Sequence, residues 1–285
     1  MIDLEHRIRE RNDAEAGTRL AVHAFVLNQL DAILSSSGPR PAGRRSAHTD
    51  TIWVYWAQGE RTMPPIVSAC VRELRRRNPA SAVVLLDDAT IGRYVDIPSW
   101  VYDRIFDNKT HFSDILRVSL LARYGGIWVD ATCLCVANLH DFVAPKLASG
   151  FLAYARNPDD TFMLSSWFMA ADPGSVIPTL LRDALYVYWR TRTTLEHYFL
   201  IHFLFEALHN LHRPFREQWA HRAPLDAYEA HRLQLRLTAP FDAGKWAEIL
   251  AASTVHKLTY KLPDADLPVG SFCDHLLRWT QRLPD

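Results

Sequence analysis

The 285-residue sequence predicts a domain of the α/β class with a largely parallel sheet. Two short runs, residues 52–56 and 83–88, have the apolar character of buried strands, and a segment with helical spacing separates them. Residues 110–135 continue the alternation, because a helical pattern there is followed by two glycines and another apolar run. Strands that alternate with helices favour parallel pairing through helical crossovers.

An N-terminal extension precedes this domain. Residues 2–35 have the pattern of one or two amphipathic helices, and their apolar set is Leu20, Val22, Phe25, Val26 and Leu30. The stretch 35–46 contains two prolines and two glycines, as linkers do. We therefore predict an extension and linker over residues 1–50 and the main domain over residues 51–285. The pattern assigns no function to the extension.

The first two predicted strands are joined by a helix. Pro64 and Pro65 suit its first turn, where a missing amide hydrogen costs nothing. Asn78, followed by Pro79, ends it just before the second strand.

The central segment is predicted to form a helix, a turn and a strand. Apolar residues recur at helical spacing from Phe112 to Leu120, and the pair Gly125 and Gly126 then provides the left-handed turn that commonly closes a helix. A strand of three apolar residues follows and ends at Asp130. Ligands of open α/β sheets bind beyond the carboxyl ends of the strands, so Asp130 is a candidate catalytic or metal-binding carboxylate.

The central helix also carries a charged pair. Asp114 and Arg117 are three residues apart, so they share a helix face and can pair. The same face continues through Leu121 and Tyr124, which predicts a pair at the edge of the core and not on a solvated surface.

The remainder of the chain continues the mixed pattern. We expect strands at residues 151–154 and 162–171, followed by helical structure rich in aromatic residues over 176–211. Residues 212–250 indicate helices and loops without further detail. A last segment of interest, residues 253–261, reads S-T-V-H-K-L-T-Y-K.

Composition excludes several classes of protein. The 32 basic and 32 acidic residues give no net charge, which argues against nucleic acid as a partner. The charged N-terminus has no signal-peptide pattern, and no apolar run approaches the roughly 20 residues that span a bilayer. The four cysteines fit neither a zinc site nor a disulfide scaffold, so we expect reduced cysteines in or near the core and a cytoplasmic protein.

The central segment resembles a group of nucleotide-sugar glycosyltransferases. S-D-x-x-R at residues 113–117, followed by Y-G-G and I-W-x-D-A-T up to Thr132, is similar to the capsular polysaccharide synthesis proteins and, more distantly, to yeast mannosyltransferases and clostridial glucosylating toxins. Those families carry an Asp-x-Asp motif where this chain has Asp130, Ala131 and Thr132. The second carboxylate is therefore replaced by a hydroxyl.

The resemblance implies a GT-A fold, which is a Rossmann-like sheet flanked by helices, and a bacterial, cytoplasmic glycosyltransferase of polysaccharide or related biosynthesis. It implies a nucleoside diphosphate sugar donor, most simply a UDP-sugar, and a glycan or small-molecule acceptor. It also implies transfer with retention of anomeric configuration and Mn²⁺ or Mg²⁺ as cofactor. Peripheral association with the inner face of the membrane and a homodimer remain open.

The resemblance also assigns roles to individual residues. Asp130, Asp114 and Arg117 would be the catalytic residues. The donor would contact Trp53, Trp56, Gln58, Asp114, Arg117, Gly126, His256, Lys257 and Lys261. The acceptor would lie near Ser165, Ser166, Glu196 and His197. The metal ligands would be Asp130, Thr132 and His256.

Several of these assignments have an alternative. Trp53 fits a core position as well as a base-stacking one, Asp114 and Arg117 could form a purely structural pair, and residues 253–261 could be an ordinary strand with outward lysines. At the level of function, the missing second carboxylate leaves open a non-catalytic subunit that binds sugar nucleotides or glycans in a polysaccharide assembly. Hydrolysis of the donor by the purified protein would separate the two readings.

Overall fold

The structure is a computed structural model that describes residues 2–36, 50–155, 164–262 and 268–281. Its strands are β1 (Thr51–Tyr55), β2 (Ala82–Leu86), β3 (Gly126–Val129), β4 (Cys133–Cys135), β5 (Phe151–Tyr154), β6 (Ser165–Ala171) and β7 (Val255–Lys257). Its α-helices are α1 (Ile2–Ser36), α2 (Pro65–Arg77), α3 (Ser99–Ile105), α4 (Lys109–Tyr124), α5 (Leu139–Val143), α6 (Val176–Thr191), α7 (Leu200–Leu211), α8 (Arg213–Ala220), α9 (Ala227–His231), α10 (Ala243–Ala252) and α11 (Phe272–Gln281).

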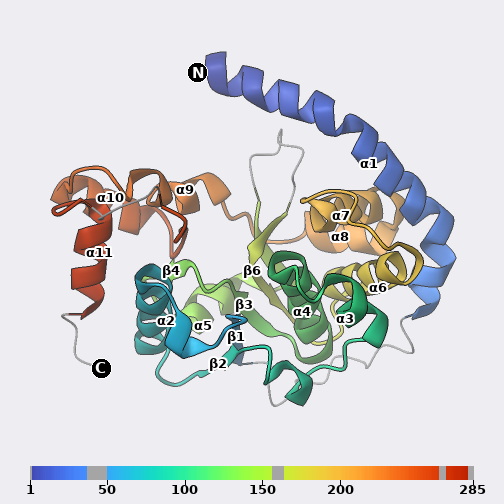
Figure 1. Ribbon diagram of the computed structural model, residues 1–285, viewed down its shortest axis with the longest axis horizontal. Coiled ribbons are helices and arrows are strands. Elements are labelled where there is room, and N and C mark those ends of the chain that lie inside the picture. Colours follow the sequence, from blue (N-terminus) through green and yellow to red (C-terminus); the bar gives the residue numbers. More distant parts are fainter. Residues whose placement is uncertain (1, 37–49, 156–163, 263–267, 282–285) are drawn as a thin grey trace.

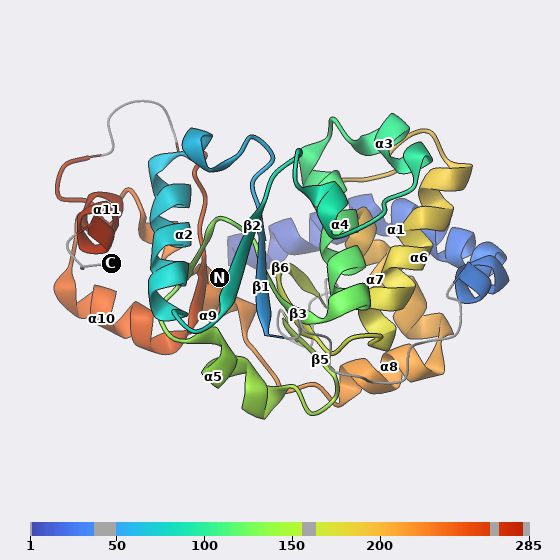
Figure 2. The ribbon, with the colours of Figure 1, turned by 90° about the horizontal axis from the view of Figure 1, so that it is seen from below.

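A five-stranded sheet forms the centre of the molecule, in the order β2-β1-β3-β6-β5. β1 pairs in parallel with β2 and β3, whereas β6 runs antiparallel to both β3 and β5. Helices α3, α4, α6, α7 and α8 lie on one side of this sheet, and α2, α5 and α9–α11 lie on the other (Figures 1 and 2). The predicted α/β class is thereby confirmed, with strands at the predicted places.

Alternation along the strands gives the sheet two separate cores. Trp53 and Trp128 face the cluster that α4, α6 and α7 complete, while Ile52 and Ile127 face the cluster beneath α2 and α5. Because both faces are covered, the central strands are apolar without interruption. This is why residues 52–56 show no polar alternation in the sequence.

The N-terminal extension is one helix, α1, that runs along α7 and α6 (Figure 1). Val22, Val26 and Ile33 are buried and join the same core cluster as α4 and the sheet. The C-terminal half of α1 therefore packs on the main body. The predicted linker lies mostly outside the described residues, so the division of the chain at residue 50 stays a prediction.

A second, two-stranded sheet lies beside the first. β4 pairs antiparallel with β7, with Cys133 opposite Lys257 and Leu134 opposite His256. The backbone amide of Leu258 extends the pairing to the carbonyl oxygen of Thr132 at 2.9 Å. This sheet holds β7, which comes from the C-terminal part of the chain, beside the residues that directly follow β3. The cysteines at 70, 133, 135 and 273 are buried and unbridged, as expected.

The turn after α4 depends on glycine. Gly125 closes the helix at φ 68° and ψ −151°, a region that only glycine occupies readily. The carbonyl oxygen of Gly125 accepts a hydrogen bond from Trp53 Nε1 at 3.0 Å. A Cβ on Gly125 would lie 2.6 Å from the carbonyl oxygen of Ala171. The turn thus has backbone neighbours that cannot move aside easily.

We expect Gly125→Ala to lower the free energy of unfolding by at least about 2 kcal/mol, because it adds both backbone strain and a clash. Urea denaturation measures this. Gly92→Ala is the matched control, since a Cβ there meets nothing within 4 Å. Equal midpoints for the two variants would contradict the role of Gly125.

The helical stretch expected over residues 176–211 is interrupted, which corrects that prediction. Between α6 and α7 the chain forms a loop, and the side chain of Tyr188 bonds to its backbone at two residues. The hydroxyl of Tyr188 donates to the carbonyl oxygen of Thr194 at 3.0 Å and accepts from the amide of Glu196 at 2.9 Å. This loop carries Tyr198 and Phe199 to the cleft described next.

Across the described ranges, no helix combines the length and the apolar character needed to cross a bilayer.

Candidate active site

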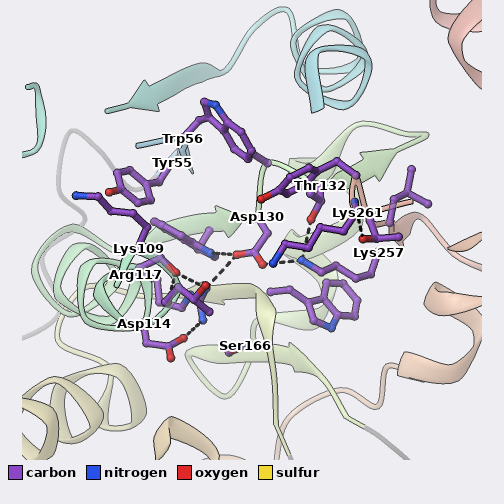
Figure 3. A pocket seen from close by; sticks show the side chains of 18 of the residues that line it. Tyr55, Trp56, Lys109, Asp114, Arg117, Asp130, Thr132, Ser166, Lys257 and Lys261 are labelled. Atoms are coloured by element: carbon purple, nitrogen blue, oxygen red, sulfur yellow. Dashed lines mark hydrogen bonds and ion pairs between the residues drawn. The ribbon is translucent and has the colours of Figure 1, made fainter. Parts of the chain in front are cut away.

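A cleft of about 570 Å³ opens at the carboxyl ends of β1 and β3 (Figure 3). This is the expected place for a ligand in an open α/β sheet. Its walls include the loop after β1, α4, the loop after β3, β6, the loop after α6, and β7 with the segment that follows it. The volume lies within the range of small-molecule sites, which is roughly 300–1,000 Å³.

Asp130 lies at the centre of a charged network in this cleft. Its Oδ1 accepts hydrogen bonds from Arg117 Nη2 at 3.0 Å and from Trp128 Nε1 at 2.9 Å. Its Oδ2 accepts from Lys257 Nζ at 2.7 Å. The side chain of Asp130 is 22% exposed, so it lies at the cleft surface, and these three hydrogen bonds fix its carboxylate there.

α4 supplies the second carboxylate of the network. Asp114 accepts a hydrogen bond from Arg117 Nη1, as the spacing of the two residues predicted. Arg117 Nη2 also donates to Ser113 Oγ at 3.2 Å. The guanidinium thus joins Asp114 to Asp130, with its carbon 5.3 Å from the centre of the Trp128 ring. Asp114 and Arg117 both line the cleft, so this ion pair is accessible from the site and is not confined to the core.

Lys257 reaches Asp130 because β7 pairs with β4. Its ammonium also donates to Thr132 Oγ1 at 2.8 Å. The side chain of Lys257 is 20% exposed, and Figure 3 shows it pointing toward Asp130 and Thr132. A lysine from the C-terminal part of the chain therefore bridges the first and last residues of the Asp-Ala-Thr sequence.

These neighbours keep the central charges in place. Burial raises the pKa of Asp130, but the charges of Lys257 and Arg117 outweigh burial and hold that pKa below its usual range. Burial likewise lowers the pKa of Lys257, and the adjacent Asp130 more than restores it. Both groups are therefore charged at neutral pH.

Asp114 behaves differently. Burial raises its pKa to about 6 even though Arg117 acts in the opposite direction. A carboxyl group whose pKa rises on folding stabilises the protein below its unfolded pKa, near 3.8, and that stability is lost as the pH rises through 6.

We therefore expect the unfolding free energy of the wild type, relative to Asp114→Asn, to fall by about 2 kcal/mol between about pH 4 and about pH 7. Using the difference between the two proteins cancels the titration of groups that lie far from Asp114. Urea denaturation at several pH values measures it. A difference that is constant with pH, or that grows toward neutral pH, would contradict the assignment.

The structure brings most of the predicted residues together. The predicted residues that line the cleft are Trp56, Gln58, Asp114, Arg117, Asp130, Thr132, Ser166, Lys257 and Lys261. Trp56 packs edge-to-face against Tyr260, with ring centres 5.3 Å apart. An aromatic wall thus faces the charged network.

Three predicted donor contacts lie outside the cleft. Trp53 is fully buried, and its ring packs against Tyr94 and Tyr124, so the core reading was right. Gly126 begins β3 at the end of the strand opposite to Asp130. His256 is also fully buried, and burial lowers its pKa to about 4. Neighbours on a strand point to opposite sides, so His256 cannot share the site of Lys257.

Of the residues predicted to lie near the acceptor, one lines the cleft and three do not. Ser166 lines the cleft, whereas Ser165, its neighbour on β6, is buried on the other face. Glu196 and His197 belong to the loop after α6, where the ring of His197 packs 5.2 Å from that of Phe203. Among the described residues, Tyr198 and Phe199 extend from that loop to the cleft instead.

The sequence reasoning missed several lining residues: Lys109, Ser113, Tyr198, Phe199, His202, His231, Gln234 and Tyr260. Lys109 and Ser113 precede Arg117 by eight and four residues, so helical spacing alone could have placed all three on one face. No comparable signal marks His231 or Gln234, because α9 and the turn after it reach the cleft only through the tertiary fold.

A divalent cation fits these residues poorly. Both oxygens of Asp130 and the hydroxyl of Thr132 already accept hydrogen bonds from side-chain cations or Trp128. His256 lies on the far side of β7. Within the part of the chain that the structure describes, no three His, Cys, Asp or Glu side chains are grouped to hold a metal. The metal requirement stays a prediction based on resemblance.

Known proteins are similar to large parts of this chain. Residues 8–276 match the family described as capsular polysaccharide synthesis protein. The O-glycosyltransferase braB of Annulohypoxylon truncatum is 33% identical over 146 residues, which are 44% of this chain and 34% of that protein. The O-glycosyltransferase PaGT of Phomopsis amygdali is 28% identical over 136 residues, or 41% and 34% of the two chains.

The chain thus matches about a third of the length of these two curated relatives. Among solved structures, it is similar to the apo-form glycosyltransferase GlyE of Streptococcus pneumoniae TIGR4, with a TM-score of 0.44 and 15% identity. That match covers 81% of this chain and 60% of the other.

Proposed function

This chain belongs to the capsular polysaccharide synthesis protein family, and we propose that it transfers a sugar from a nucleoside diphosphate sugar to an acceptor hydroxyl. One observation carries the proposal. The carboxylate of Asp130 stands at the carboxyl end of β3, in the cleft, between the cationic groups of Arg117 and Lys257. Homology supports the same activity, because the relatives are named glycosyltransferases.

The charge distribution suits the leaving group of such a reaction. When the bond between the sugar and the diphosphate breaks, negative charge grows on the phosphate oxygen, and preorganised cations stabilise it most effectively. Lys109, Arg117, Lys257 and Lys261 all line the cleft. Asp114 and Asp130 fix Arg117 in place, so its positive charge is preorganised beside the position of the leaving group.

The remaining walls suit the other parts of the two substrates. Trp56 and Tyr260 offer aromatic faces for the base of the nucleotide, which we propose to be uridine, and Gln58 lies beside them in the cleft. Ser166 and Tyr198 lie on the walls formed by β6 and the loop after α6, where an acceptor could enter. We assign the acceptor to this side.

We further propose that the reaction retains anomeric configuration. Both oxygens of Asp130 accept hydrogen bonds from Arg117, Trp128 or Lys257, so this carboxylate is not poised to act as nucleophile or base. The acceptor proton would then pass to the departing phosphate oxygen as the acceptor attacks from the same face. From the resemblance we also propose a bacterial, cytoplasmic protein. The two curated relatives are fungal proteins.

The alternative function, a non-catalytic binding subunit, is favoured by the lack of a second carboxylate at Thr132. Release of nucleoside diphosphate separates the two. The purified protein should be incubated with UDP-, GDP-, ADP- and dTDP-linked hexoses, with water or simple sugars and phenols as acceptors. Sustained release from one donor supports the transferase. Stoichiometric binding of a donor without any release supports the binding subunit.

A further inference from the structure

The ammonium of Lys257 occupies the position where an Asp-x-Asp motif would offer its oxygens to a metal. It lies 2.7 Å from Asp130 Oδ2 and 2.8 Å from Thr132 Oγ1. The remaining oxygen of Asp130 is engaged by Arg117 and Trp128. Every side-chain oxygen of the Asp-Ala-Thr sequence therefore already has a hydrogen-bond donor.

The position of Lys257 is set by backbone structure. Its residue pairs with Cys133 across the β4–β7 sheet, and Leu258 continues the pairing to the carbonyl oxygen of Thr132. The side chain is four-fifths buried. A lysine held in this way is a fixed positive charge, unlike one on a flexible surface segment.

The replacement at residue 132 matches this arrangement. A carboxylate there would add negative charge and attract a divalent ion, whereas a hydroxyl serves as a neutral acceptor for an ammonium group. A divalent cation bound to Asp130 would also be close to the ammonium of Lys257 and to the guanidinium of Arg117. Repulsion between these like charges disfavours its binding.

We propose that the Lys257 ammonium takes the place of the divalent cation, so that the diphosphate of the donor is bound and neutralised without metal. This inference rests on the proposed function. An ammonium has three N–H groups, and two of them are used on Asp130 and Thr132 among the described residues. The third can donate to a phosphate oxygen of the donor.

In the transfer step, the bond between the anomeric carbon and the phosphate oxygen breaks, and its electron pair stays on that oxygen. The anomeric carbon forms a bond to the acceptor oxygen, whose proton passes to the departing phosphate. Lys257 donates a hydrogen bond throughout and keeps its protons. Its charge opposes the charge that develops on the leaving group.

The test is calorimetric titration of the full chain with UDP, GDP, ADP and dTDP, each in excess EDTA and in MnCl₂. We expect at least one nucleotide to bind in EDTA, with an affinity that Mn²⁺ changes by less than about threefold. Lys257→Met should weaken that binding in EDTA by about 10- to 100-fold, as for loss of a charged hydrogen bond. Lys245→Met, which removes an exposed lysine on α10, should leave it unchanged.

Binding that requires Mn²⁺ and disappears in EDTA would overturn the role of Lys257 and leave the proposed function intact. Failure of every nucleoside diphosphate to bind, with or without Mn²⁺, would overturn the proposed function itself. The wild-type measurements need no variant, so they decide whether metal is required even if Lys257→Met fails to fold. Lys257→Arg, which keeps the positive charge, should then retain binding in EDTA.

Discussion

Asp130→Asn is expected to lower the rate of sugar transfer by about 100- to 1,000-fold, the range found when one preorganised electrostatic contact is lost. Asp130 is the group that holds Arg117 and Lys257 side by side, at 3.0 and 2.7 Å from its two oxygens. Asparagine keeps the shape and can still accept from Trp128, but it removes the charge that fixes both cations. The measurement is the initial rate of nucleoside diphosphate release.

Folding must be monitored in the same experiment. Loss of the carboxylate leaves Lys257 partly buried without its main counterion, so we also expect a lower melting temperature. Asp31→Asn, at an exposed position on α1, is the matched control and should behave as the wild type. A folded Asp130→Asn protein with near-normal turnover would remove Asp130 from the mechanism.

The second large effect concerns stability. Arg117→Ala should lower the free energy of unfolding by about 3–5 kcal/mol, because it leaves the carboxylates of Asp114 and Asp130 without their shared partner. The Arg117 side chain is only 5% exposed, so water cannot replace it readily. Urea denaturation at neutral pH measures the loss.

A double variant tests the reason for that loss. Adding Asp114→Asn to Arg117→Ala removes one of the uncompensated charges, so the double variant should be more stable than Arg117→Ala alone. If the two substitutions were simply additive, the buried ion pair would not be what Arg117 contributes. Activity should remain low in both, since each lacks the guanidinium in the cleft.

The parts of the site that sequence reasoning found are those encoded locally. Asp114 and Arg117 lie on one helix, and Asp130 follows directly on the strand after it, so helical spacing and strand position were enough to place them. The strands themselves were recognisable because both faces of the sheet are covered and their sequences are therefore apolar throughout.

The pairing of β4 with β7, which are far apart in the sequence, could not be predicted from local patterns. Only the register of β4 against β7 determines that Lys257, and not His256, enters the cleft. A shift of one residue would exchange the two side chains. Residues 192–199 were expected to be helical. Helical spacing gives no sign that the hydroxyl of Tyr188 bonds to the backbone six and eight residues further along the chain, at Thr194 and Glu196.

The pairing of β4 with β7 also joins parts of the chain that are synthesised at different times. Asp130 and Lys257 are 127 residues apart. During translation the five strands of the central sheet and helices α4, α6 and α7 are therefore synthesised well before Lys257. Of the two cationic side chains that contact Asp130 in the described part of the protein, Arg117 is made early and Lys257 late. A nascent chain that stops short of residue 255 therefore contains most of the scaffold but not the complete charged cluster, and the site is among the last parts of the protein to form.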